Sequence, residues 1–285
     1  MDAGQPLVGA LRLDANLSIL FPDLPLLERP AAAAAAGFDA VELWWPFDEP
    51  APPTSDVDDL VAAIEAAGVR LVLLNLWLGD REAGQHGLLS AVGARSAFLA
   101  NLDVVTDIVG RLGGAIVNSH VGNVPQGADR DALAEAAVAG LALAAPRITA
   151  AGATLVVEAL NPFDFPRYGL QNTRDALSLA QRASEACGSR VGVLFDAYHV
   201  QRTEGDLFGP LAEAAGHIAH VQVADVPGRG SPGSGSIDFA RFFAELERSG
   251  YGGFVGLEYL PSAEPAETFA WLRDAAAGWR PPDGR

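Results

Sequence analysis

Four polar side chains stand at the carboxyl ends of four short apolar segments, where their type and spacing could support chemistry. Glu158, Asp196, Gln222 and Glu258 end the segments LVVE, VGVLFD, HVQ and FVGLE, respectively. A carboxylate buried without a partner is neutralised or costs several kcal/mol, so each acid requires a hydrogen bond, an opposite charge or a metal ion. A single Asp at such a place is as easily the cap of the next turn. The recurrence at four strand ends predicts one shared site.

Three carboxylates and one amide oxygen form an all-oxygen ligand set, which suits a hard divalent cation such as Mg²⁺ or Mn²⁺ better than zinc. The sequence contains no lysine, so all 19 basic residues are arginine. This excludes Schiff-base aldolases, pyridoxal enzymes and Walker-type phosphate loops, which need that amine. A metal is the natural electrophile for the remaining groups. The alternative is that the four polar groups only hydrogen-bond to one another.

His199 and Arg229 are the candidate substrate contacts. His199 lies three residues after Asp196, where it either faces the site or is a hydrogen-bonded turn residue. Arg229 lies in the segment 227–237, which is rich in Gly, Ser and Pro and suits a mobile lid. Its guanidinium group would clamp an anionic substrate, or else it is an exposed loop residue.

Other histidines and aromatic residues are weaker candidates. His120 ends a predicted strand, His217 is interpreted as a surface residue, and His220 as inward but structural. Four aromatic residues follow two consecutive predicted strands: Trp44, Trp45, Phe47 and Trp77. They either wall a substrate pocket or pack in the core, and we favour the pocket wall for one or two of them.

Short apolar strands alternate with helices along the whole chain. The predicted strands are 11–16, 40–46, 70–80, 113–122, the three that end at Glu158, Asp196 and Gln222, and 254–258. The predicted helices are 25–36, 57–67, 94–111, 129–151, 173–186, one ending near 215, 237–249 and 264–277. Gly68 ends the second helix, and Pro146 is expected to bend the fourth.

This alternation predicts an α/β fold, a single (βα)8 TIM barrel over residues 1–285, with a frayed tail at about 278–285. The rival is a doubly wound open sheet, but no G-x-G-x-x-G opens a helix after the first strand. In a barrel the carboxyl ends of all strands meet at one mouth. Glu158, Asp196, Gln222 and Glu258 are therefore expected to converge there.

Composition narrows the class of protein. Hydrophobic residues make up 49% of the 285 residues, which suits one large folded domain. No run of eighteen apolar residues or signal peptide is found, so we expect a cytoplasmic protein without a membrane partner. A single cysteine, Cys187, rules out an internal disulfide and any multi-cysteine metal site. The net charge of -17 argues against a nucleic-acid partner.

Most of these segments resemble the hydroxypyruvate isomerase family, within the xylose isomerase-like barrels that also include ketose 3-epimerases. The matching segments are DANLSILF, GFDAVELWWPFD, NL and GD within 75–80, VVEALNPFDFP, FDAYHVQRTEGDL, HVQVADVPGRG and GFVGLEY. The resemblance implies that Glu158, Asp196, Gln222 and Glu258 are metal ligands, with Glu158 and Glu258 also the paired acid and base. It further implies that His199 and Arg229 contact the substrate.

The chain departs from the family pattern at two places near the mouth. Where the family reads R-x-E-P-G-T-G-E-I after the seventh strand, Ser231 and Ser236 replace the two glutamates. Where the family reads N-L-P-A-G-D, Trp77 replaces the proline. Two negative charges are absent and a large indole is added, so the substrate within the class is left open.

The expected function is a divalent-metal-dependent isomerase of the hydroxypyruvate isomerase type. It would move a proton through a metal-bound enediolate of a small hydroxy-carbonyl acid or ketose. A ketose 3-epimerase would use the same residues but return the proton to the opposite face of the same carbon. Outside this class, the alternatives are a non-catalytic sugar-acid binding protein and, more remotely, an endonuclease IV-like nuclease. The sequence leaves isomerase versus epimerase, the metal and homo-oligomerisation open.

Overall fold

Eight parallel strands close into a barrel in the computed structural model, which describes residues 7–80, 84–89, 93–262 and 267–276. Each strand pairs with the next along the chain, and the last pairs with the first, Leu13 lying opposite Val255. The barrel strands are β2 (Leu11–Asn16), β3 (Ala40–Leu43), β4 (Arg70–Asn75), β5 (Ile116–Asn118), β6 (Thr154–Glu158), β7 (Val191–Asp196), β8 (Ile218–Val223) and β9 (Phe254–Leu257). The predicted TIM barrel is confirmed.

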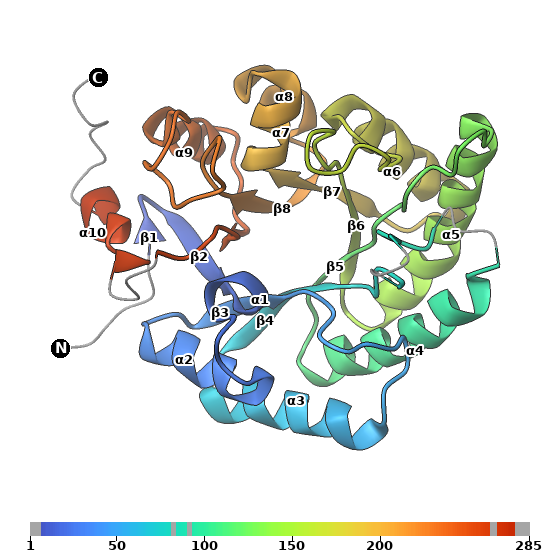
Figure 1. The fold of residues 1–285 in the computed structure, drawn as a ribbon, viewed down its shortest axis with the longest axis horizontal. Helices are drawn as coiled ribbons and strands as arrows, with labels where there is room; N and C mark the ends of the chain where they lie inside the picture. Colours follow the sequence, from blue (N-terminus) through green and yellow to red (C-terminus); the bar gives the residue numbers. More distant parts are fainter. Residues whose placement is uncertain (1–6, 81–83, 90–92, 263–266, 277–285) are drawn as a thin grey trace.

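Helices surround the strands (Figure 1). They are α1 (Leu17–Leu20), α2 (Arg29–Ala35), α3 (Thr54–Ala67), α4 (Arg95–Arg111), α5 (Arg130–Ala150), α6 (Thr173–Cys187), α7 (Ala197–Glu204), α8 (Phe208–Ala214), α9 (Phe239–Arg248) and α10 (Trp271–Ala276). Among the described helices, α5 alone has the length and apolar composition of a membrane span, and here it packs against α6 and β6 of the barrel.

Burial on both faces explains why the strands are rich in Val and Leu. One face of each strand packs against the helices. In α3, for example, Val57, Leu60, Val61 and Ile64 recur at helical spacing and are buried against the barrel. The other face points into the barrel, where Leu73, Val156 and Leu194 form a separate apolar cluster. Polar residues of β2, β3 and β8 are also buried, among them Asp14, Glu42 and His220.

The structure differs from the sequence prediction in short elements. A two-residue strand, β1 (Leu7–Val8), pairs antiparallel with β2, and α1 follows β2 without a loop. The predicted helix 25–36 is a turn of 3-10 helix (Leu26–Glu28) followed by α2, and Pro30 lies in the first turn of α2. The single helix expected before β8 is two helices, because Gly205 ends α7 in a left-handed conformation.

Some predictions fall outside the described residues. The expected start of the last helix lies within 263–266, and the expected frayed tail lies within 277–285. Pro146, by contrast, is among the described residues and lies inside α5, the helix in which a bend was predicted.

Candidate active site at the carboxyl ends of the strands

One carboxylate oxygen of Asp196 caps a helix, and the other is buried near Glu158 and His199. Its Oδ1 atom accepts a hydrogen bond from the backbone N–H of Tyr198 at 2.7 Å and thereby caps α7. Its Oδ2 atom is buried and has no hydrogen-bond partner among the described residues. Burial raises the pKa of Asp196 to about 7, with Glu158 adding to the effect and Arg229 opposing it. The free oxygen is available to a cation.

Glu158 is held by donors from β5 and the residues after it. Its Oε2 atom accepts a hydrogen bond from Asn118 Nδ2 at 2.7 Å and lies 3.3 Å from His120 Nε2. Burial alone would raise the pKa of Glu158, but the hydrogen bond and charge of His120, with His199 and Asn118, leave it below its ordinary value. Glu158 is therefore a carboxylate at neutral pH.

Glu258 directly follows β9 and is held by four donors. Its Oε1 atom accepts hydrogen bonds from Trp44 Nε1 at 2.6 Å, Asn16 Nδ2 at 3.1 Å and Gln222 Nε2 at 3.2 Å. Its Oε2 atom forms an ion pair with Arg229. Burial, together with the neighbouring acids, still raises the pKa of Glu258 well above its ordinary value, although Arg229 opposes this.

Gln222 presents its carbonyl oxygen without a partner. Its Nε2 atom donates to Glu42 Oε1 at 2.8 Å as well as to Glu258, so the amide group is oriented by two acceptors. The Oε1 atom is buried and has no hydrogen-bond partner among the described residues. Gln222 Oε1 and Asp196 Oδ2 are thus two unpaired buried oxygens on adjacent strands, in register with each other. Such a donor set fits a hard divalent ion.

His199 does not join this ligand set through either nitrogen. Its Nε2 atom lies close to Asp196 and Glu158, with ligand atoms of the three residues within 4.8 Å of one another. However, its Nδ1 atom accepts a hydrogen bond from the backbone N–H of Asn161 at 3.1 Å. Burial lowers the pKa of His199 to about 3, so the ring is neutral and its proton lies on Nε2. A protonated nitrogen donates a hydrogen bond and does not bind a metal.

Arg229 is part of the site and is not an exposed loop residue. Its side chain is 19% exposed and its guanidinium group lies 5.3 Å from the centre of the Tyr198 ring. Burial lowers the pKa of Arg229, but the charges of Glu258, Asp196 and Glu158 outweigh burial and raise it. Its backbone is in the left-handed region, with φ of 55°. The loop conformation therefore turns this side chain toward the mouth.

Asp225 organises the loop that carries Arg229, which the sequence reasoning missed. Its two carboxylate oxygens accept hydrogen bonds from the backbone N–H groups of Val226, Gly233, Gly235 and Ile237 at 2.8–3.0 Å. The carboxylate is buried, and these four donors satisfy it. The Gly- and Ser-rich segment, interpreted as a mobile lid from sequence, is folded around one acid.

A cavity of about 130 Å³ lies between the two glutamates. Four of the predicted site residues line it: Glu158, His199, Arg229 and Glu258. Asp196 and Gln222 lie at the strand ends beside these residues. The sequence reasoning missed Asn16 and Asn118, which hold the two glutamates, and it considered Trp44 only as a pocket wall or core residue. Asn16 and Asn118 each end a strand, so applying the strand-end criterion to amides as well as acids would have found them.

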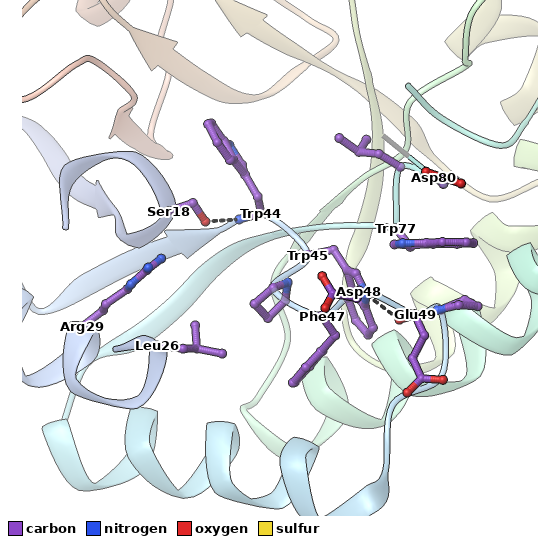
Figure 2. Close-up of a pocket in the computed structure, with 14 residues that line it drawn as sticks. Ser18, Leu26, Arg29, Trp44, Trp45, Phe47, Asp48, Glu49, Trp77 and Asp80 are labelled. Atoms are coloured by element: carbon purple, nitrogen blue, oxygen red, sulfur yellow. Dashed lines mark hydrogen bonds between the residues drawn. The ribbon is translucent and has the colours of Figure 1, made fainter. Parts of the chain in front are cut away.

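A larger pocket of about 900 Å³ adjoins this cavity, and Trp44 and Leu78 line both. All four aromatic residues singled out from the sequence line the larger pocket: Trp44, Trp45, Phe47 and Trp77. Figure 2 shows Trp45 and Phe47 beside each other, with Trp44 turned away from them. The indole N–H of Trp44 reaches Glu258, while that of Trp45 donates to the carbonyl of Glu49 at 3.0 Å.

Comparison with known proteins agrees with the fold. A family model described as xylose isomerase-like TIM barrel matches residues 30–275. The chain belongs to the xylose isomerase-like TIM barrel family. Two relatives are the "Putative hydroxypyruvate isomerase" of Streptomyces coelicolor, 45% identical over 94% of this chain and 98% of the relative, and the hydroxypyruvate isomerase of Escherichia coli, 33% identical over 92% and 98%.

A solved structure of this family superimposes closely on the barrel. It is described as an AP endonuclease of family 2 from Brucella melitensis, with a TM-score of 0.84, 32% sequence identity, and coverage of 92% of this chain and 98% of that chain. The resemblance to the hydroxypyruvate isomerase family is therefore confirmed over most of the chain. The chain is an isomerase of this family.

Proposed function

We propose that the protein isomerises a small hydroxy-carbonyl acid by moving a proton between adjacent carbon atoms through an enediolate, with a divalent metal ion bound at the mouth. The observation that carries this proposal is the pair of buried glutamates, Glu158 and Glu258, which line the same 130 Å³ cavity. Proton transfer between carbons needs a base and an acid on either side of the reacting atoms. The two strand ends supply one each.

The environments of the two glutamates support different roles. Glu158 is ionised, and the described donors to it, Asn118 and His120, both lie at its Oε2 atom, so it is suited to remove the carbon-bound proton. Glu258 is held by donors on both oxygens, which fixes its carboxyl group relative to the cavity. We assign the return of the proton to Glu258. His199 Nε2 donates to the substrate, while its Nδ1 atom is fixed by Asn161.

Four side chains would hold the ion: Glu158, Asp196, Gln222 and Glu258. The unpaired buried Oδ2 of Asp196 and Oε1 of Gln222 support this assignment. A bound Mg²⁺ or Mn²⁺ would supply electrophilic stabilisation of the negative charge that develops on the substrate oxygens. Arg229 binds the carboxylate of the substrate, since its guanidinium group faces the same cavity and stays charged.

Proton NMR in D₂O tests the reaction directly. The protein is incubated with Mn²⁺ or Mg²⁺ and a panel of hydroxy-carbonyl acids and neutral ketoses. The proposal expects loss of one substrate C–H signal by exchange and appearance of the product with the carbonyl group moved to the adjacent carbon. Inversion at one carbon, with the carbonyl group in place, would instead identify a 3-epimerase. Binding without exchange for any member of the panel would favour a non-catalytic sensor.

Charge argues against a nuclease for this chain. Three acids and one arginine lie at the mouth, and the net charge of the chain is -17, so a phosphodiester backbone is repelled at long range. A cytoplasmic location, the absence of nucleic-acid and membrane partners, and the oligomeric state remain predictions of the sequence.

A further inference from the structure

Three ionisable side chains meet inside the barrel, among residues that the proposed reaction does not use. Asp14 of β2, Glu42 of β3 and His220 of β8 are each at most 1% exposed. His220 Nε2 lies 2.8 Å from Glu42 Oε2 and 3.9 Å from Asp14 Oδ2. Potential ligand atoms of the three residues lie within 4.8 Å of one another. We call these three residues the inner cluster.

The inner cluster is separate from the mouth but connected to it. Glu42 Oε2 faces His220, whereas Glu42 Oε1 accepts from Asn16 Nδ2 at 2.7 Å and from Gln222 Nε2 at 2.8 Å. These two amides also donate to Glu258 and so lie between the cluster and the mouth. In another part of the barrel interior, Leu73, Val156 and Leu194 form an apolar cluster.

Asp14 is the unexplained member of the cluster. Both of its carboxylate oxygens are buried, and neither has a hydrogen-bond partner among the described residues. Within the described residues, no arginine forms an ion pair with Asp14 or Glu42, and the nearest arginine in sequence, Arg12, donates to the carbonyl of Gly252. A buried carboxylate without a partner carries a large free-energy cost. A proton or a cation must therefore compensate the negative charge of the Asp14 carboxylate.

A proton alone does not satisfy this carboxyl group. Protonation would remove the charge of Asp14, and burial beside Glu42 and Glu258 does raise its pKa well above the ordinary value. The new O–H group would still lack an acceptor, because no described residue offers either oxygen of Asp14 a hydrogen-bond partner. A cation placed between Asp14, Glu42 and His220 would satisfy all three groups at once.

The spacing of the cluster fits one transition-metal ion. Ligands about 2.0–2.2 Å from a tetrahedral ion lie roughly 3.3–3.6 Å from one another, and the observed 2.8 and 3.9 Å separations fall on either side of that range. Gly256 of β9 permits the arrangement, since a Cβ atom there would lie 2.4 Å from Glu42 Oε2. An imidazole with two carboxylates selects Zn²⁺, Mn²⁺ or Fe²⁺ over Mg²⁺.

We propose that Asp14, Glu42 and His220 form a second, inner binding site for a divalent transition-metal ion. The ion would replace the proton that His220 Nε2 shares with Glu42 Oε2, so binding releases this proton. Because the site is closed by Asn16 and Gln222, the inner ion exchanges more slowly than the ion at the mouth. The site does not depend on the proposed isomerase activity.

Zinc stoichiometry of four matched proteins tests the inner site. Wild type, Asp14→Asn, Asp196→Asn and the double variant are produced in medium with Zn²⁺, freed of loose metal by gel filtration, and assayed by mass spectrometry. If each site holds one ion, wild type retains about two Zn²⁺ per chain, each single variant about one, and the double variant only background. A brief chelator treatment should remove the ion of Asp14→Asn faster than that of Asp196→Asn.

The pattern of losses separates the two sites. About one Zn²⁺ in wild type that Asp14→Asn keeps and Asp196→Asn loses would overturn the inner site. The reverse pattern would support the inner site and count against the metal of the proposed reaction. Anomalous diffraction from wild-type crystals grown with Zn²⁺ gives an answer even if a variant fails to fold. A peak between Asp14, Glu42 and His220 is expected, and an ordered water there without a peak would overturn the proposal.

Discussion

A glutamate lies on each of two sides of the mouth, and the surroundings shift the pKa of Glu158 and that of Glu258 in opposite directions. On the side of β5 and β6, Glu158 accepts from Asn118 and lies beside His120, and its pKa is lowered. On the side of β9, β2 and β3, burial and the charges of other acids raise the pKa of Glu258 despite the ion pair with Arg229. Two glutamates at equivalent strand ends thus differ because of their neighbours.

This difference shows what the barrel contributes to the proposed chemistry. Acid and base roles require two groups whose proton affinities differ. A symmetric ring of strands alone would place both glutamates in equivalent positions. The asymmetry comes from the inward side chains: apolar residues such as Leu73 and Val156 on one part, and Glu42 with Asp14 on the other. The negative charge below Glu258 has no counterpart in the apolar cluster.

Replacing either glutamate should have the largest effect. Glu158→Gln and Glu258→Gln each keep the shape of the side chain but remove the proton acceptor, so kcat/KM should fall by about 10³-fold or more. Exchange of substrate C–H for deuterium, followed by proton NMR, measures the loss. Circular dichroism of both variants controls for folding. Activity within tenfold of wild type in either variant would contradict the assignment of that glutamate.

Asp196→Asn should weaken Mn²⁺ binding by about 100-fold, because an anionic ligand becomes neutral while its cap of α7 is retained.

Without metal, the effect of Asp196→Asn on the free energy of unfolding depends on pH. The pKa of Asp196 is about 7 in the folded protein and about 4 when unfolded, so its favourable contribution is present below about pH 4 and is lost as pH rises through 7.

Chemical denaturation of the chelator-treated proteins checks that sign. The neutral amide mimics the protonated acid, so metal-free Asp196→Asn should match wild type near pH 4 and exceed its free energy of unfolding by up to about 4 kcal/mol at pH 8. Saturating Mn²⁺ should narrow this difference at pH 8 by about 2.7 kcal/mol, the equivalent of the 100-fold weaker binding, since only wild type keeps the anionic ligand. A metal-free variant that is less stable than wild type at pH 8 would contradict the raised pKa.

The fold and the four strand-end residues could be predicted from the sequence because both depend on local patterns. A buried strand reads as an apolar run, and a polar residue at its end is visible without any knowledge of its neighbours. The helices around the barrel followed from apolar spacing and from stops such as Gly68. The sequence also placed His220 inward and His217 at the surface; His220 is buried and His217 is half-buried.

The contacts that make the two glutamates unequal could not be predicted. The inner cluster exists because β9 closes onto β2, which brings residues of β2, β3 and β8 together from opposite ends of the chain. The ion pair of Arg229 with Glu258 depends on a loop that Asp225 folds and on a left-handed backbone at Arg229. Such contacts are set by closure and by loop geometry, which leave no periodic signal.

Arg229→Ala should act mainly on substrate binding. Loss of a charged hydrogen bond to a substrate carboxylate should raise KM for anionic substrates by about 10- to 100-fold, equivalent to about 1.5–3 kcal/mol, and affect neutral ketoses much less. Arg202→Ala is the matched control, because Arg202 also lies over the Tyr198 ring, at 5.5 Å, but pairs with Asp164. An unchanged KM for every anionic substrate, or an equal rise in both variants, would contradict the proposed clamp.

The smallest effects should come from the neutral donors on the two sides of the mouth, and these test the comparison most directly. Asn118→Leu removes the 2.7 Å hydrogen bond to Glu158, which favours the charged form. The pKa of Glu158 should therefore rise, and the acid limb of the kcat/KM profile should move to higher pH.

Trp44→Phe removes the 2.6 Å hydrogen bond to Glu258 but keeps an aromatic ring beside it. It should lower kcat/KM by about tenfold at all pH values through looser positioning, without moving that limb. A shift of the acid limb in Trp44→Phe, or its absence in Asn118→Leu, would show that Glu158 is not the base.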